Sequence, residues 1–441
     1  MTPSIQTRSS SSASLDLLRR HSLPLEGPDD LDPLLERIAD ARVVMLGEST
    51  HGTSEFYTWR ARLSQRLIQE HGFSFIAVEG DWPDCYRLNR FVKGYGQTGD
   101  HALDIAARFQ RWPTWMWANW EVVALLDWIH RFNQNLPSAE QVGFFGLDVY
   151  SLHDSMMAIL NFVKDKDPEA LPTTEKALNC FAPHGLSGQD YARAVSLVRA
   201  HCEEEVIELL TELRRRAPFF DGDREEHFNA LQNARVLKNA EAYYRTMLRP
   251  GPDSWNLRDH HMDQTLQDLL DFHGPDSRAI VWEHNTHIGD ARYTDMSSAG
   301  MINLGQLARE RFGDDDVVLV GFGTYRGSVI AASSWGAPME EISLPTAIDE
   351  SWEDLLHRAL GEDCLLLLDE IEEFEEFNQP RNHRAVGVVY HPWRESFANY
   401  VPTILPGRYD ALIYIDESHA LHPLHLKTKR RLEPDTYPWG L

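Results

Sequence analysis

The stretch ARVVMLGESTHGTSEF, residues 41–56, joins an apolar run to a crowded polar turn and then to the start of an amphipathic segment. The apolar residues at 43–46 follow one another without the alternation of a half-exposed strand, which favours a strand covered on both faces. The segment 54–71 that comes next is typical of a helix. A buried strand followed directly by a helix is the repeating unit of α/β proteins.

Eight further apolar runs of this kind follow along the chain, and helical segments such as 121–134 and 302–313 alternate with them, the second with Gly313 as its expected C-cap. The runs are FSFIAVEGD (73–81), VGFFGLDVY (142–150), RAIVWEHN (278–285), VVLVGFGTY (317–325), GSVIAAS (327–333), CLLLLDE (364–370), RAVGVVYH (384–391) and DALIYIDES (410–418). We therefore expect an α/β fold, with a central mixed, largely parallel sheet flanked by helices.

Between Tyr150 and Gly274 the strand signal disappears, and long charged helical segments such as 191–216 and 226–248 replace it. Because the alternation of strands and helices resumes near residue 278, this region is expected to be an insertion within one domain. The predicted organisation is a disordered leader at 1–14, an α/β catalytic core at 15–150 and 275–441, and a helical insertion at 151–274.

The chain is acidic, with 42 Lys and Arg against 68 Asp and Glu and a formal net charge of −26. Such an excess repels nucleic acid and anionic lipid, so we expect neither as a partner, and no apolar stretch reaches the ~18 residues of a membrane span. The four cysteines show no metal or disulfide spacing, which predicts free thiols in a reducing cytoplasm. They are Cys85, Cys180, Cys202 and Cys364.

Polar side chains stand at the ends of four of the expected strands. They are Glu48 and His51, Glu79 and Asp81, Asp148, and Glu283, His284 and His287. Ligands of open α/β sheets bind at the carboxyl ends of strands, where diverging loops leave a crevice. Two of the segments that follow these strands, GESTHG and EHNTH, each contain a glutamate and a histidine. We therefore expect one site in which burial and the neighbouring charges shift the pKa of a base.

A histidine in such a place could take a proton from water and direct the hydroxide at an ester, while a carboxylate holds its tautomer. Neither LGEST nor GTSEF has the pattern of a serine nucleophile elbow, so water is the expected attacker. Two alternatives stay open at this point. One is a metal-dependent hydrolase with His51, Glu48, Glu79, His284 and His287 as ligands, and the other is a non-catalytic binder of lipophilic ligands.

Three neighbouring segments bear on substrate binding. The segment RWPTWMWANWEV (111–122) holds four of the 13 tryptophans, and Trp112, Trp115 and Trp117 could wall an apolar pocket or pack in the core. Arg292 and Tyr293 are expected on a substrate loop after the segment EHNTH. The segment 254–262 is expected to start a helix capped by Asn256, with a structural role for Arg258 and Asp259.

Eight motifs carry a resemblance to the erythromycin esterase family. They are LGESTHGTSEF, FIAVEGDWPDCYRLNRFV, RWPTWMWANWEV, FFGLDVYSL, SWNLRDHHM, VWEHNTHIGDAR, GFGTYRGSV and YIDESHALHPL, in the family's order from about residue 30 to residue 425. The chain resembles the broad environmental branch of the family more closely than its antibiotic-resistance members. The resemblance implies a mixed α/β core with a helical insertion.

The resemblance also implies an activity, namely hydrolysis of a macrolactone or other carboxylic ester by water that a histidine base activates. The implied partner is a small-molecule ester such as a macrolide, and no cofactor is implied. The base falls on His51. The family's supporting residues fall on Glu48, Arg60, Glu79, His284 and His287. Arg60 lies one or two helical turns beyond His51, so its long side chain would return either to an ion pair with Glu79 or Asp81 or to the reacting groups.

Overall fold

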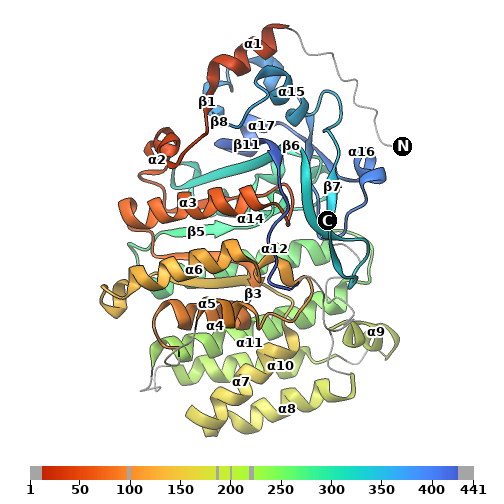
Figure 1. The fold of residues 1–441 in the computed structure, drawn as a ribbon. Helices are drawn as coiled ribbons and strands as arrows, with labels where there is room; N and C mark the ends of the chain where they lie inside the picture. The colour runs from red at the N-terminus through yellow and green to blue at the C-terminus, as the bar shows by residue number, and fades with distance from the viewer. Residues whose placement is uncertain (1–11, 97–100, 185–187, 199–200, 218–222, 426–441) are drawn as a thin grey trace.

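The computed structural model describes residues 12–96, 101–184, 188–198, 201–217 and 223–425 (Figure 1). Its main sheet has nine strands in the order β1-β8-β11-β6-β2-β5-β3-β4, with β7 paired to β6 outside this path. These strands are β1 (Ser22–Pro24), β2 (Val43–Leu46), β3 (Phe75–Asp81), β4 (Gly143–Asp148), β5 (Ala279–Trp282), β6 (Val317–Ala332), β7 (Met339–Leu344), β8 (Cys364–Leu367) and β11 (Ala411–Ser418). A separate pair consists of β9 (Arg381–Arg384) and β10 (Tyr400–Thr403).

The six strands from β11 to β4 along this order run parallel, while β1, β7 and β8 pair antiparallel. The sheet is therefore mixed and largely parallel, which confirms the expected fold class. Two of the expected strands, at 317–325 and 327–333, form the single 16-residue strand β6. The expected strand at 384–391 is wrong, because β9 ends at Arg384 and the residues after it make isolated bridges only, at Val386 and Val389.

Helices cover both faces of the sheet, and each face has its own apolar core. The helices that precede the insertion are α1 (Ser12–His21), α2 (Asp32–Ile38), α3 (Ser54–His71), α4 (Trp82–Val92), α5 (Ala102–Ala106) and α6 (Trp120–Asn133). Those that follow it are α13 (Asn285–Ile288), α14 (Leu304–Phe312), α15 (Trp352–Ala359), α16 (Glu395–Ala398) and α17 (Leu405–Arg408). Gly313 is the C-cap of α14, as expected, and its φ is positive at 90°.

Residues 1–11 of the predicted leader lie outside the described residues. Its last residues, from Ser12 to Ser14, correct the prediction because they belong to α1, where Ser14 is buried. The helix packs against α15 through Leu18, which is fully buried in the core of that face of the sheet. None of the described helices is long and apolar enough to cross a lipid bilayer.

Six helices separate β4 from β5, and the described part of this region contains no strand. They are α7 (Leu152–Lys166), α8 (Leu171–Phe181), α9 (Gly188–Val198), α10 (Glu203–Arg216), α11 (Arg224–Thr246) and α12 (Asp253–His273). Helices α7, α8, α10 and α11 lie together beyond the β4 edge of the sheet (Figure 1) and share a third apolar core. Helix α12 differs from them, because its Met262, Leu266 and Leu269 pack in the core of the sheet itself.

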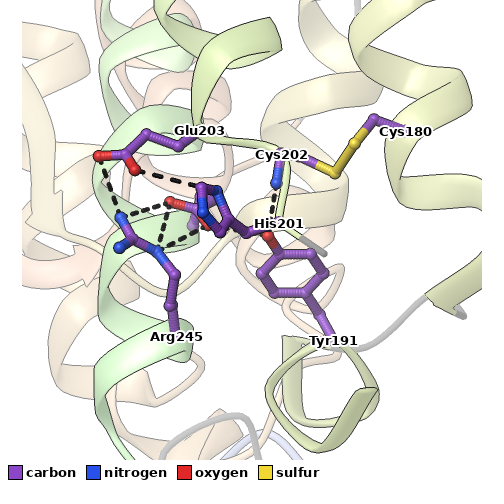
Figure 2. The surroundings of a disulfide bond; sticks show 7 residues. Cys180, Tyr191, His201, Cys202, Glu203 and Arg245 are labelled. Carbon is purple, nitrogen blue, oxygen red and sulfur yellow. Dashed lines mark hydrogen bonds and ion pairs between the residues drawn. A yellow bond between two sulfur atoms is a disulfide. The ribbon is translucent and has the colours of Figure 1, made fainter. Parts of the chain in front are cut away.

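The insertion contains a disulfide bond between Cys180 and Cys202, which corrects the expectation of four free cysteines (Figure 2). The bond joins the end of α8 to the residue before α10. Beside it, the Tyr191 hydroxyl accepts a hydrogen bond from the Cys202 amide at 2.9 Å and donates one to Glu241 at 2.8 Å. Cys85 and Cys364 are free, as the sequence predicted for all four cysteines, and both are buried.

Candidate active site

The candidate site lies where four neighbouring strands end. In the sheet, β2, β5, β3 and β4 follow one another and run parallel, so their carboxyl ends share one edge. Glu48 and His51 follow β2, Glu79 and Asp148 lie in the last residues of β3 and β4, and His284 follows β5. The chain separates these residues widely, and the order of the strands brings them together. All five side chains are buried.

His51 is held by a chain of polar contacts that runs back to Arg60 on α3. Its Nδ1 lies 2.8 Å from Glu48 Oε1, and Arg60 Nη2 donates to Glu48 Oε2 at 2.7 Å. The Arg60 guanidinium also stacks on the rings of Tyr57 and Trp282. Of the two alternatives for Arg60, the ion pair with Glu79 or Asp81 is wrong, and the side chain returns instead to Glu48, the carboxylate that contacts His51.

The electrostatic surroundings raise the pKa of His51. Burial lowers this pKa, but the hydrogen bond with Glu48 and the negative charges of Glu79 and Glu48 outweigh it. Since Nδ1–H donates to Glu48, the lone pair of neutral His51 is on Nε2. His51 also lines a cavity together with Glu79, so this arrangement presents a base to a buried space.

His284 has the opposite electrostatic character, although its ring centroid is only 4.7 Å from that of His51. Its Nδ1 accepts a hydrogen bond from the Thr286 amide at 3.3 Å and lies 2.8 Å from the Thr286 hydroxyl. Burial, and then the charge of His51, hold the pKa of His284 well below its usual value. His284 is therefore a neutral imidazole with its proton on Nε2, and Nε2 is buried with no hydrogen-bond partner among the described residues.

Glu79 is a buried anion that two donors hold in place. Arg258 Nη2 donates to Glu79 Oε1 at 2.6 Å, and the His284 amide donates to Oε2 at 2.9 Å. Burial raises the pKa of Glu79, but the charge of Arg258, followed by those of His287 and His51, brings it well below the usual value. Arg258 also donates to both oxygens of Asp148, from Nε to Oδ1 at 3.0 Å and from Nη2 to Oδ2 at 2.8 Å. Arg258 therefore links the ends of β3 and β4.

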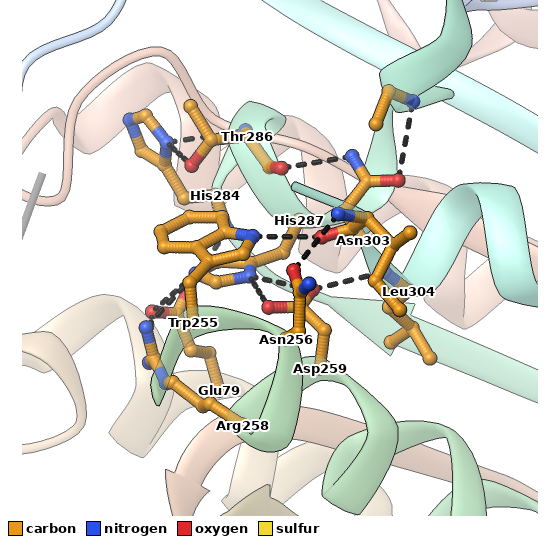
Figure 3. A network of polar contacts seen from close by, with 12 residues as sticks. Glu79, Trp255, Asn256, Arg258, Asp259, His284, Thr286, His287, Asn303 and Leu304 are labelled. Atoms are coloured by element: carbon orange, nitrogen blue, oxygen red, sulfur yellow. Dashed lines mark hydrogen bonds and ion pairs between the residues drawn. The ribbon is translucent and has the colours of Figure 1, made fainter. Parts of the chain in front are cut away.

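His287 positions Arg258 and does not reach His51 directly. Its Nε2 lies 2.9 Å from Arg258 Nη1, and its Nδ1 lies 2.9 and 3.1 Å from the two oxygens of Asp259. The ring stacks on Trp255 with centroids 4.5 Å apart. Figure 3 shows this network between α12 and the loop after β5. Because both ring nitrogens of His287 already have partners, Arg258 on one side and Asp259 on the other, the ring acts as an orienting group.

The expectation for the segment 254–262 was right about the start of a helix and wrong about its cap. Helix α12 begins at Asp253, so Asn256 lies inside it, and its side chain bonds to Gly300 O and Ile302 N instead of capping the helix. Arg258 and Asp259, which were expected to be structural, contact Glu79 and His287 of the candidate site. The signal that pointed to them was the resemblance of this segment to a family motif, because no strand ends there.

The cavity has a polar side and an aromatic side. The residues that line it are His51, Glu79, Gly80, Asp81, Asp84, Phe109, Arg111, Trp112, Pro113, Met116, Trp117, Asp148, Tyr150, Arg258, Trp335 and Val388. On the polar side, Arg111 pairs with Asp81, and burial raises the pKa of Asp81 to about 7 even though the charge of Arg111 lowers it. Trp117 Nε1 donates to the backbone oxygen of Glu79 at 3.0 Å.

Of the five residues expected to bind substrate, two line the cavity, namely Trp112 and Trp117. Trp115 is fully buried and packs edge-on against Trp112, which places it in the core. Arg292 and Tyr293 do not line the described cavity. Arg292 forms an ion pair with Asp290, and Tyr293 packs against Gly407 with its side chain partly exposed.

No group of three His, Cys, Asp or Glu side chains in the described part of the chain is arranged to hold a metal ion. Four of the five donors of the metal alternative have partners within the protein, whereas His284 Nε2 has none among the described residues. Glu48 holds His51 and Arg60, and Glu79 holds Arg258. The donor set therefore fits a metal ion poorly.

Comparison with known proteins gives matches over most of the chain. The family model for erythromycin esterase matches residues 68–418. YbfO of Bacillus subtilis (strain 168), which is named as a hydrolase, is 22% identical over 423 residues that cover 90% of each chain. Erythromycin esterase type II of Escherichia coli is 29% identical over 160 residues, 35% of this chain and 36% of its own.

Solved structures share the fold. A Bacillus cereus protein superposes with a TM-score of 0.80 at 20% identity, covering 95% of this chain and 100% of that one. A mutant of the erythromycin esterase EreC, in its open conformation, superposes with a TM-score of 0.66 at 19% identity, covering 94% and 98% of the two chains.

Proposed function

The chain belongs to the erythromycin esterase family and is an ester-hydrolysing enzyme, and we propose that it cleaves a carboxylic ester or lactone with His51 as general base. The observation that carries this proposal is the contact chain from Arg60 through Glu48 to His51, which ends at the cavity. A carboxylate that orients an imidazole from behind is the arrangement by which hydrolases activate a nucleophile.

In the proposed reaction, water attacks the carbonyl carbon while His51 Nε2 takes a proton from it. Glu48 accepts the hydrogen bond from Nδ1–H and stabilises the imidazolium that forms. Collapse of the tetrahedral intermediate breaks the carbon–oxygen ester bond, and His51 returns the proton to the leaving alkoxide. The products are an acid and an alcohol, or, from a lactone, one hydroxy acid that carries the elements of one added water.

His284 is proposed to stabilise the oxyanion of this intermediate. Its pKa keeps it neutral beside His51, and its buried Nε2–H has no partner among the described residues, which leaves it available as a donor. The negative charge of Glu79 raises the pKa of His51, and a protonated His284 would compete for that charge. The neighbouring carboxyl of Glu283 is also kept uncharged, because burial, followed by the charges of Glu79 and Asp259, raises its pKa well above the usual value.

Hydrolysis is proposed to proceed without a resident metal ion, because both carboxylates of the candidate ligand set already pair with arginines, Glu48 with Arg60 and Glu79 with Arg258. The measurement is activity after dialysis against a chelator, together with elemental analysis of the purified enzyme. Unchanged activity in metal-free protein supports the proposal. Loss of activity that zinc or manganese restores would establish the metal-dependent alternative.

The test of the proposed function is a mass-spectrometric panel of esters, small lactones and macrolides, in which hydrolysis of a lactone appears as a gain of one water. At least one substrate should be hydrolysed by the enzyme and not by His51→Asn, with both proteins folded by circular dichroism. A ligand that binds without turnover in both proteins would instead establish the non-catalytic binder. The macrolides in the panel test the substrate and the role in antibiotic resistance that the resemblance implies.

A further inference from the structure

The cavity at the site is small. Its volume is about 70 Å³, whereas a groove lined by α10, α11 and α12 on the same molecule measures about 820 Å³. A cavity needs roughly 10–15 Å³ for each water, and pockets for drug-sized ligands have ~300–1,000 Å³. The space beside His51 therefore suits a compact ester group and excludes a large ring.

Two tryptophans from distant parts of the chain limit this space. Trp112 precedes α6, and Trp335 lies in the turn between β6 and β7. Both line the cavity, and their ring centroids are 5.0 Å apart. Trp112 Nε1 also donates a hydrogen bond to the backbone oxygen of Ala337 at 3.0 Å, which ties the segment before α6 to the turn. We name this contact, formed by Trp112, Trp335 and Ala337, the tryptophan clasp.

The two tryptophans of the clasp differ in how deeply each is buried in the surrounding protein. Trp112 is buried and packs edge-on against Trp115, which is itself fully buried in the core. Trp335 is half-buried and follows the exposed Ser333 and Ser334. Removal of the Trp335 side chain therefore enlarges the cavity from a surface turn and leaves the core beneath Trp112 in place.

The polar side of the cavity indicates which substrate charge the site accepts. Its two guanidinium groups are both engaged by carboxylates, Arg111 by Asp81 and Arg258 by Glu79 and Asp148. A substrate that carries a carboxylate would meet these acids, together with Asp84, without a vacant cation. An uncharged substrate avoids that repulsion.

We propose that the tryptophan clasp is a size filter, and that the enzyme selects compact, uncharged esters and small-ring lactones over macrolide-sized rings. The inference rests on the proposed ester hydrolysis and specifies its substrate class. Trp335 is the specificity-determining residue of the clasp, because its ring closes the space that the fixed Trp112 leaves open. A large ring gains access only when Trp335 moves off Trp112.

The experiment compares two uncharged lactones that differ in ring size, δ-valerolactone and ω-pentadecalactone, by pH-stat measurement of kcat/KM. The wild type should favour the small ring. Trp335→Ala should raise the ratio of large-ring to small-ring kcat/KM by about tenfold or more, the range of a contact in an apolar pocket. Trp112→Phe, which keeps a ring but loses the hydrogen bond to Ala337, should shift the ratio in the same direction by less.

Trp393→Ala is the matched control, because Trp393 is 73% exposed and does not line the described cavity. Its ratio should equal that of the wild type. A wild type that opens the large ring as efficiently as the small one, or a Trp335→Ala ratio equal to that of the control, would overturn the size filter while ester hydrolysis stands. If the wild type hydrolyses neither lactone nor any ester of the panel, the proposed function fails, and the size filter with it.

Discussion

The loops after β2 and β5 have nearly the same chemical content, a glutamate and a histidine directly after a buried strand, yet the fold gives them opposite electrostatic character. After β2, Glu48 is held by Arg60 and His51, and the pKa of His51 is raised. After β5, both oxygens of Glu283 are buried with no partner among the described residues, and the pKa of His284 is lowered.

The two loops also fix different tautomers of their histidines. Arg60 donates to Glu48 and holds it against His51 Nδ1, so the lone pair of neutral His51 is on Nε2. In the other loop, the Thr286 amide donates to His284 Nδ1, so His284 presents a proton instead. The residue types in a motif therefore determine which chemistry is available, and the partners behind them determine which histidine accepts a proton and which donates a hydrogen bond.

Removal of the proposed base, His51, should have the largest effect on activity. His51→Asn should lower kcat/KM for the best ester by roughly 10⁴-fold, the upper end for a general base, because no other described imidazole presents a lone pair to the cavity. The measurement is steady-state hydrolysis by pH-stat, with circular dichroism to show that the variant folds. Retention of more than a tenth of the activity would assign the base elsewhere.

Removal of the donor in the second loop should have a smaller effect. His284→Phe keeps a ring beside His51 but has no N–H, and should lower kcat by roughly 10²-fold, as expected for the loss of one oxyanion donor. The variant should keep the pH of half-maximal activity close to that of the wild type, because His284 is uncharged in both the free and the reacting enzyme. A loss as large as that of His51→Asn would mean that the two histidines share the base role.

The charge that Glu79 places near His51 can be tested through pH. Only neutral His51 accepts a proton, so activity should rise as the pH rises through its pKa, which lies above the ordinary value of ~6.5. Glu79→Gln removes a negative charge that raises this pKa, so the acid limb of kcat/KM should move to lower pH. The control Glu417→Gln, at an exposed ion pair with Arg326, should leave the profile in place. An acid limb that stays fixed in Glu79→Gln would show that His51 is not the titrating group.

The smallest effect on activity is expected from breaking the disulfide bond of the insertion. Cys202→Ser opens the disulfide with Cys180, whose 22-residue separation corresponds to about 3 kcal/mol of stability. Denaturant unfolding should report that loss, while kcat/KM stays unchanged because the bond lies in the separate core of the insertion. A fall in kcat/KM at temperatures where the variant is folded would show that the insertion shapes the site.

The same bond tests the predicted cytoplasmic location. Disulfides form in oxidising compartments and are rare in a reducing cytoplasm. Thiol labelling of the protein taken directly from cells should find Cys180 and Cys202 reduced if the location is cytoplasmic. Protection of both thiols would place the protein in an oxidising environment.

Much of the fold follows from local sequence patterns. The runs at 43–46 and 279–282 are apolar throughout because both faces of the sheet are covered, and the turn after each carries polar groups because parallel strands end at one edge. For that reason the sequence alone is enough to group Glu48, His51, Glu79 and His284 into one site.

The remaining features depend on packing between distant segments. Arg258 and Asp259 come from a helix of the insertion, and nothing local shows that α12 lies on the sheet and not with its neighbours. The pairing of Cys180 with Cys202 depends on how α8 and α10 approach, which spacing does not reveal. The sequence left two alternatives for Arg60, because the helical rise limits its reach without specifying which carboxylate lies there.

The assignment of opposite roles to the two histidines can be measured directly by ¹⁵N NMR titration of histidine-labelled enzyme, with His51→Asn and His284→Phe used to assign the signals. We predict that His51 keeps its Nδ1 proton throughout and that its Nε2 titrates with a midpoint above ~6.5, while His284 stays neutral with its proton on Nε2. If His284 instead becomes protonated near neutral pH while His51 stays uncharged, the proposed assignment of base and donor is contradicted.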